Sequence, residues 1–64
     1  MLVNGVEAEE FAGLTVQELI AAKGIVPRGV AVALNGTVVR RSEWALVRVA
    51  QGDAIEIVTA VAGG

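Results

Sequence analysis

The stretch from Thr15 to Gly24 reads TVQELIAAKG and predicts the single helix on which the fold depends. Thr15 followed by Glu18 matches a capping box, in which each side chain accepts a hydrogen bond from the other residue's backbone N–H. Three apolar residues recur at the spacing of one helical stripe: Val16, Leu19 and Ile20. Gly24 suits the left-handed residue that closes a helix, and Pro27 beyond it acts as a stop.

A β-hairpin is predicted before this helix. Asn4-Gly5 separates Met1–Val3 from residues 6–11, and Asn-Gly is a strong hairpin signal because both residues accept a positive φ. Glu7 and Glu9 alternate with apolar residues, so we expect the second arm to be a strand with one face in water. Two acids on one strand face could serve as a catalytic pair. A solvated face is favoured, because so small a domain rarely builds the deep cleft that such chemistry needs.

A second hairpin and a final strand are predicted after the helix. Residues 30–34 are apolar and rich in β-branched valine, Asn35-Gly36 marks a tight turn, and residues 37–39 return as a short arm. Trp44 is expected to anchor the loop that follows to the core. Residues 54–58 alternate as the last strand.

Runs of strands on both sides of one helix predict an α+β fold. A single helix packed across a small mixed sheet buries both apolar faces, which is the ubiquitin-like β-grasp architecture. We expect residues 1–59 to form this β-grasp domain. Residues 60–64 are expected to form a flexible C-terminal tail that ends in Gly63-Gly64.

The composition disfavours a self-contained enzyme. The 64 residues include no Cys and no His, so the thiolate nucleophile, the commonest general base and the usual metal ligands are missing, and no catalytic or metal-binding residue is predicted. The net charge of −2 disfavours nucleic acid as a partner. No apolar run approaches the roughly 20 residues of a membrane span, and no export signal is visible, so a cytoplasmic location is expected.

The C-terminal tail offers the one reactive group expected of such a chain. Residues 60–64 carry no charged side chain, and at about 3.3 Å per residue they could reach about 16 Å beyond the sheet. Because glycine has no Cβ, Gly63 and Gly64 could enter a narrow channel and present the terminal carboxylate to another protein. The alternative is a passive β-grasp interaction domain in which Gly-Gly is an incidental frayed end.

Seven segments stand in order along the chain: Val3-Asn4-Gly5, Thr15-Val16 with Leu19, Pro27–Val32, Asn35-Gly36, Val39–Trp44, Gly52–Val58 and Gly63-Gly64. Together they resemble the ThiS-type sulfur carriers of thiamine biosynthesis over essentially the whole chain. The Arg-Ser-Glu-Trp segment at 41–44 and the strand at 52–58, followed by Gly-Gly, are the more specific parts. The basic pair Arg40-Arg41 is a departure, since relatives often have Pro before the Arg, and the stretch from Trp44 to Ala50, rich in alanine and valine, is another.

The resemblance implies a carrier that is not an enzyme and binds no cofactor itself. A ThiF-type adenylyltransferase using ATP and Mg would convert the Gly64 carboxylate to an acyl adenylate. Sulfur drawn from a cysteine desulfurase would then displace AMP and leave a thiocarboxylate, which a ThiG-type thiazole synthase would accept. The exposed face of the last strands, with Ile57 or Val58, is a plausible docking surface for these partners.

Two other functions remain open at this point, because they use the same C-terminal chemistry. One is the small subunit of molybdopterin synthase, a sulfur carrier for the molybdenum cofactor. The other is a ubiquitin-like protein modifier that is joined to lysines.

Overall fold

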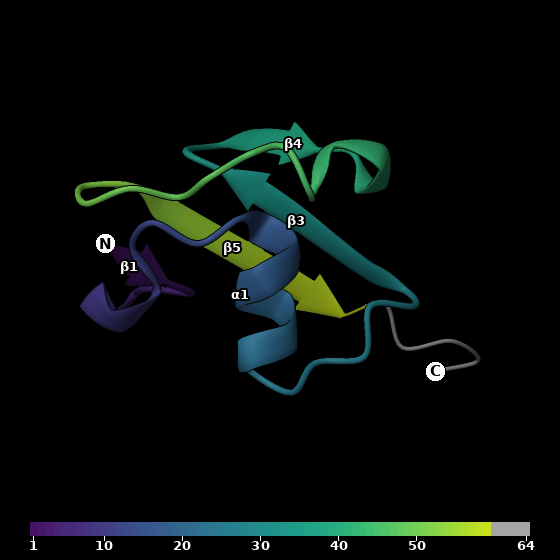
Figure 1. Cartoon of the computed structure of the whole chain (residues 1–64), viewed down its shortest axis with the longest axis horizontal. Coiled ribbons are helices and arrows are strands. Elements are labelled where there is room, and N and C mark those ends of the chain that lie inside the picture. The colour runs from purple at the N-terminus through teal and green to yellow at the C-terminus, as the bar shows by residue number, and fades with distance from the viewer. Residues whose placement is uncertain (60–64) are drawn as a thin grey trace.

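The computed structural model describes residues 1–59 as five strands, one α-helix and two short 3-10 helices (Figure 1). The strands are β1 (Leu2–Val3), β2 (Val6–Glu7), β3 (Val30–Leu34), β4 (Thr37–Val39) and β5 (Ala54–Thr59). The helices are η1 (Glu9–Phe11), α1 (Val16–Ala22) and η2 (Arg41–Glu43). The predicted α+β fold is confirmed. The predicted tail at 60–64 lies outside the described residues.

Strand β5 lies at the centre of a mixed sheet with the order β2-β1-β5-β3-β4. It pairs with β1 in parallel and with β3 antiparallel. Strands β1 and β2 form one antiparallel hairpin, and β3 and β4 form the other. Figure 1 shows α1 crossing one face of this sheet. The last strand in the sequence therefore joins two hairpins that are far apart along the chain.

The predicted capping box of α1 is present. The Glu18 N–H donates to Thr15 Oγ1 at 3.1 Å, and the Thr15 N–H donates to Glu18 Oε1 at 2.8 Å. The bond from the Thr15 N–H stabilises the ionised carboxyl, so it holds the pKa of Glu18 below its usual range. The predicted apolar stripe is fully buried against the sheet: Val16, Leu19 and Ile20. Gly24 follows the helix with φ +69°, as expected of a residue that closes a helix.

The core lies between α1 and the sheet. Val32 of β3 and Ile55 of β5 are each 1 % exposed and face the helix. Trp44 is 2 % exposed, and its indole Nε1–H donates to the Val39 carbonyl at 3.1 Å. The bond satisfies the one polar atom of the side chain, so the predicted anchoring role of Trp44 is confirmed.

The second arm of the first hairpin is shorter than predicted. β2 ends at Glu7, and Glu9 lies in η1, so the expected strand over residues 6–11 was wrong and the two acids do not share a strand face. Ala8 is buried and continues the hairpin by one pair, with its N–H donating to the Met1 carbonyl at 3.0 Å. The backbone turns after it, where the Phe11 N–H donates to the Ala8 carbonyl at 3.2 Å. The Met1 ammonium pairs with the Glu9 carboxylate beyond the turn. This turn lets Phe11 pack against the core.

The first Asn-Gly turn also ties its hairpin to the central strand. Asn4 has a φ of +51°, as the hairpin prediction requires. Its side-chain Oδ1 accepts a hydrogen bond from the Ile57 N–H at 2.7 Å, and its Nδ2 donates to the Ile57 carbonyl at 3.3 Å. The side chain thus extends the pairing between β1 and β5 past the end of the two-residue strand β1.

The second Asn-Gly turn does the same on the other edge of β5. Asn35, also at φ +51°, accepts a hydrogen bond from the Ala54 N–H through Oδ1 at 2.9 Å. Its Nδ2 donates to Asp53 Oδ1 at 3.0 Å, and the Ala50 N–H donates to Asp53 Oδ2 at 2.9 Å. These two bonds lower the pKa of Asp53. The start of β5 is therefore fixed by side chains as well as by backbone pairing.

Replacing Asn4 by Gly tests the role of this side chain, because Gly keeps the left-handed backbone and removes both bonds to Ile57. We expect the free energy of unfolding to fall by about 1–2 kcal/mol, since the Ile57 N–H and carbonyl lose their partners. Urea unfolding followed by Trp44 fluorescence measures this. Asn4→Asp, which keeps an acceptor for the Ile57 N–H, should lose less. A Gly variant as stable as the parent would contradict the assignment.

Candidate functional site

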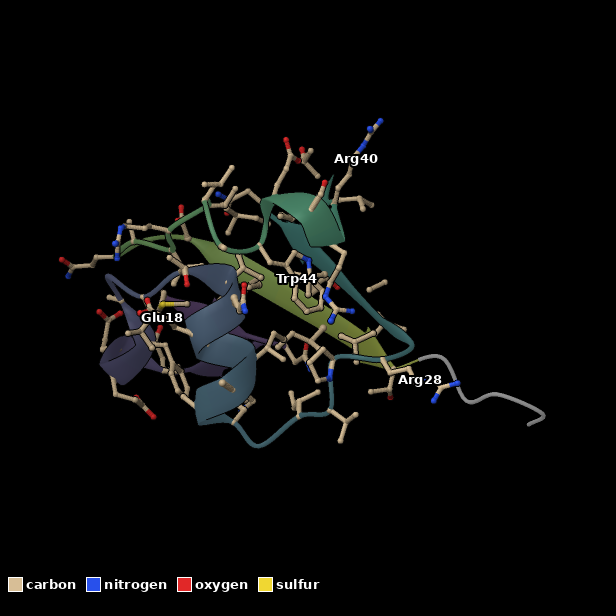
Figure 2. All side chains as sticks on the ribbon, turned by 45° about the vertical axis from the view of Figure 1, so that its right-hand side comes forward. Glu18, Arg28, Arg40 and Trp44 are labelled. Atoms are coloured by element: carbon tan, nitrogen blue, oxygen red, sulfur yellow. The ribbon has the colours of Figure 1, made fainter. Side chains whose placement is uncertain are left out.

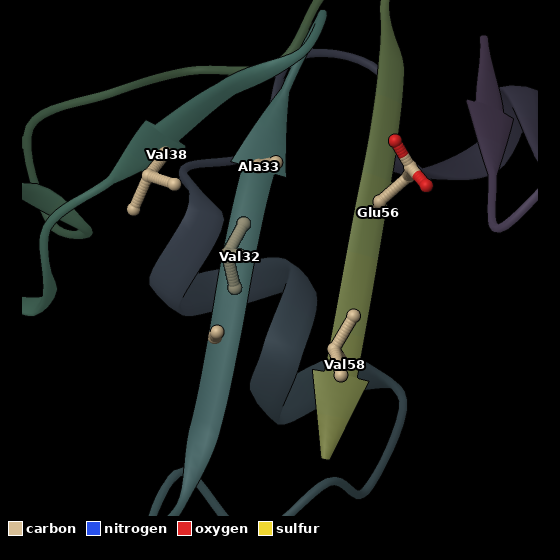
Figure 3. A pocket seen from close by; sticks show the side chains of 6 residues that line it. Val32, Ala33, Val38, Glu56 and Val58 are labelled. Atoms are coloured by element: carbon tan, nitrogen blue, oxygen red, sulfur yellow. The ribbon is translucent and has the colours of Figure 1, made fainter. Parts of the chain in front are cut away.

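The face of the sheet opposite α1 carries a shallow apolar hollow (Figure 3). Six residues line it, of which Val32 belongs to the core, and we call the other five the outer sheet face: Ala31, Ala33, Val38, Glu56 and Val58. The register brings them together, because Ala31 pairs with Val58, and Ala33 pairs with both Val38 and Glu56. The alanines keep the centre of this surface low, while Val38 is 69 % exposed and Val58 is 61 % exposed. Exposed apolar side chains gathered in this way are typical of an interaction surface.

The structure separates the two residues predicted for docking. Successive side chains of a strand point to opposite faces, so Ile57 and Val58 cannot both face outward. Ile57 is 8 % exposed and belongs to the core, whereas Val58 lies on the outer sheet face. Ile57 therefore has no surface to offer a partner, and only Val58 remains a docking candidate.

The C-terminal end of β5 sets where the predicted reactive group leaves the domain. Thr59, the last described residue, pairs with Val30 at the start of β3. Gly63 and Gly64, predicted as the tail that enters a partner and as the modified residue, lie outside the described residues. Their roles stay predictions.

The acidic side chains with clear partners have structural tasks. Glu18 caps α1, and Asp53 holds the turn before β5. Within residues 1–59, no three carboxylates gather closely enough to hold a metal ion. No helix in the same span has the length and apolar character needed to cross a membrane.

Sequence reasoning did not single out Ala31, Ala33 and Val38. The signal was present in the stretch VAVAL at 30–34, where alanines alternate with larger apolar residues. A period of two means that one face of this strand carries only small side chains. The larger residues of this strand pack toward the core, and the two alanines form the bottom of the hollow.

Fold and site together define a small ubiquitin-like β-grasp protein. The model of the ThiS family matches residues 1–64, and the chain belongs to this family, the sulfur carriers of thiamine biosynthesis. The resemblance found from the sequence is thus confirmed.

Two of the proteins similar to this chain show how far the likeness extends. The crystal structure of the thiamine biosynthesis protein ThiS from Geobacter metallireducens is 33 % identical, with a TM-score of 0.79, and the match covers 98 % of this chain and 96 % of that one. A thiazole synthase from Paramagnetospirillum magneticum is 39 % identical over 64 residues, which is 100 % of this chain. The chain spans 20 % of the length of that thiazole synthase.

Alanine substitutions at the two adjacent positions test the assignment of faces. Ile57→Ala should lower the free energy of unfolding by about 2–4 kcal/mol, because it leaves a cavity in the core. Val58→Ala should change it by no more than about 0.5 kcal/mol, because the side chain is exposed. Urea unfolding of the two variants measures both values, and equal losses would show that the faces are assigned wrongly.

Proposed function

We propose that this chain carries sulfur as a thiocarboxylate on Gly64 and delivers it to a thiazole synthase. The observation that supports this most directly is the family match over the whole chain, which includes Gly63 and Gly64. The outer sheet face and the position of Thr59 at the end of the central strand are consistent with it.

The first step activates the terminal carboxylate, which is a poor electrophile. A ThiF-type adenylyltransferase binds ATP and Mg, and an oxygen of the Gly64 carboxylate attacks the α-phosphorus of ATP. The new O–P bond forms as pyrophosphate leaves. The resulting acyl adenylate has AMP as a good leaving group.

The second step introduces sulfur. The terminal sulfur of a partner's cysteine persulfide, which a cysteine desulfurase supplies, attacks the acyl carbon, a C–S bond forms, and the C–O bond to AMP breaks. A thiol of the partner then attacks the other sulfur of this acyl disulfide, so the S–S bond breaks, the thiol is oxidised to a disulfide, and the carrier is released. The product is a thiocarboxylate, whose sulfur is softer and more nucleophilic than a carboxylate oxygen. The chain needs no catalytic side chain and no bound cofactor in this scheme, because its partners supply both, and it acts as a recyclable carrier.

The outer sheet face is the proposed docking surface for these partners. Five residues beyond Thr59 span at most about 16 Å, so a protein that accepts Gly64 must lie against the body of the carrier. Val58 precedes Thr59 directly and is exposed, and Val38 and the two alanines extend the apolar surface across β3 and β4. Docking there would place the partner beside the start of the tail.

A thiazole synthase is the proposed acceptor of the sulfur. In the relative from Paramagnetospirillum magneticum, a segment similar to this chain occupies a fifth of a polypeptide described as a thiazole synthase. Two domains of one polypeptide are present to each other at a high effective concentration, which favours transfer between a carrier and its acceptor.

Intact-mass analysis tests the function. After incubation with ATP, a ThiF-type adenylyltransferase and a sulfur donor, one oxygen of the chain should be replaced by sulfur. Oxidation of Met1 or Trp44 adds nearly the same mass, so fragmentation must locate the change at Gly64. A variant that lacks Gly63 and Gly64 is the control and should stay unmodified. An unmodified carboxylate in the full chain would refute the carrier function, and conjugates on lysines would indicate a protein modifier.

Gly63→Val tests whether the tail enters a narrow channel. The variant should fold normally, because the substitution lies beyond the β-grasp domain, but adenylation should slow by about 10- to 100-fold as the reacting carboxylate is displaced. Gly63→Ala should show a smaller loss. Release of pyrophosphate measures the rate, and parental kinetics in the Val variant would contradict the channel.

A further inference from the structure

Acidic and basic side chains are unequally distributed along the central strand, although Arg48 belongs to the acidic end, two residues before the Ala50 N–H that donates to Asp53. Strands β1 and β5 are parallel, so the start of β1 and the end of β2 lie where β5 begins. Four carboxylates belong to this end of the molecule: Glu7, Glu9, Glu10 and Asp53. The Met1 ammonium pairs with one of them, Glu9.

Arginines gather at the other end, where β5 finishes. Thr59 pairs with Val30, and Arg28 lies two residues before Val30. Strand β4 runs antiparallel to β3, so it returns the chain to the same end, where Arg40 and Arg41 follow it. Figure 2 shows Arg28 and Arg40 projecting outward on the side of the molecule away from Glu18.

Arg41 is held in place by neighbouring groups. Its guanidinium lies 4.9 Å from the centre of the Trp44 ring, and its Nη1 donates to the Pro27 carbonyl at 3.5 Å. These contacts connect η2 to the loop that leads to Arg28. Arg41 therefore helps to fix the positions of the two outer arginines.

Arg28 and Arg40 have no such task. Both are exposed, and no carboxylate within residues 1–59 forms a salt bridge with either of them. Glu43 of η2 lies three residues after Arg40 in the sequence, and it is exposed as well. Two outward-facing guanidinium groups thus remain available toward the end of the sheet where β5 finishes, Arg28 near Thr59 and Arg40 farther away, beyond β3 and β4.

We propose that Arg28 and Arg40 bind an acidic rim around the channel through which the adenylyltransferase accepts the C-terminus. This inference rests on the proposed function and adds charge recognition to the apolar docking surface. Opposite charges at the edge of an interface steer association and fix orientation. The acidic opposite end of the carrier would be repelled by the same rim, so the chain would approach with its tail forward.

The geometry favours a protein rim over the phosphates of ATP as the ligand. The Gly64 carboxylate must reach the α-phosphorus, and the extended tail would separate it from the arginines by up to about 16 Å. Groups on the body of the carrier therefore meet the mouth of the channel, not the nucleotide.

The test compares variants of equal net charge. Arg28→Gln/Arg40→Gln lowers the net charge from −2 to −4, and the control Gln17→Glu/Gln51→Glu does the same at two other exposed positions. Arg41 stays unchanged because it packs on Trp44. We measure kcat/KM for adenylation and the association rate with the adenylyltransferase at low and high salt.

At low salt the arginine variant should lose about three- to tenfold in both quantities, and the loss should vanish at high salt. The control should stay near the parent, and Arg28→Lys/Arg40→Lys should regain most of the rate because it restores the charge. Equal losses in the arginine variant and the control would overturn the proposal, and so would no loss in either. A changed KM for ATP alone would point to the nucleotide and also overturn it. Failure of the parent to be adenylated would instead refute the proposed function.

Discussion

The structure depends on hydrogen bonding along both edges of β5. One neighbour, β1, comes from the start of the chain, and the other, β3, comes from the middle, so β5 joins the two hairpins into one sheet. Backbone pairing alone would be short on the β1 side, which has two residues. Asn4 and Asn35 supply side-chain bonds at Ile57 and Ala54 that lengthen the pairing on both edges.

Local sequence signals sufficed for much of the fold. The capping box of α1, the two Asn-Gly turns and the β-branched strand at 30–34 each involve neighbouring residues, so their geometry can be read from short segments. The strand predicted over 6–11 failed because Ala8, opposite Met1, is the last of these residues to pair across the hairpin, and the bonds that follow are the local ones of η1. The hydrogen bonds between Asn4 and Ile57 join residues 53 positions apart, so no pattern within a short segment could predict them.

The candidate site, like the fold, could be predicted from the sequence only in part. Alternation along β5 showed that Ile57 and Val58 must face opposite sides, but which one faced the core depended on the register with β3 and on the position of α1. The pairing of Ala33 with both Val38 and Glu56 is likewise a property of the sheet. The family of the chain could be predicted because its identifying segments are spread along the whole sequence.

The alternation along the strands has a consequence for how such a protein can change over generations. The core residues of the sheet face α1, and the side chains of the outer sheet face point away from α1. Selection can therefore alter Val38 or Val58 to suit a new partner without weakening the core beneath. A small domain has little stability to lose. Because one face of the sheet forms the core and the other contacts partners, the binding surface can change in evolution while the stability of the domain is kept.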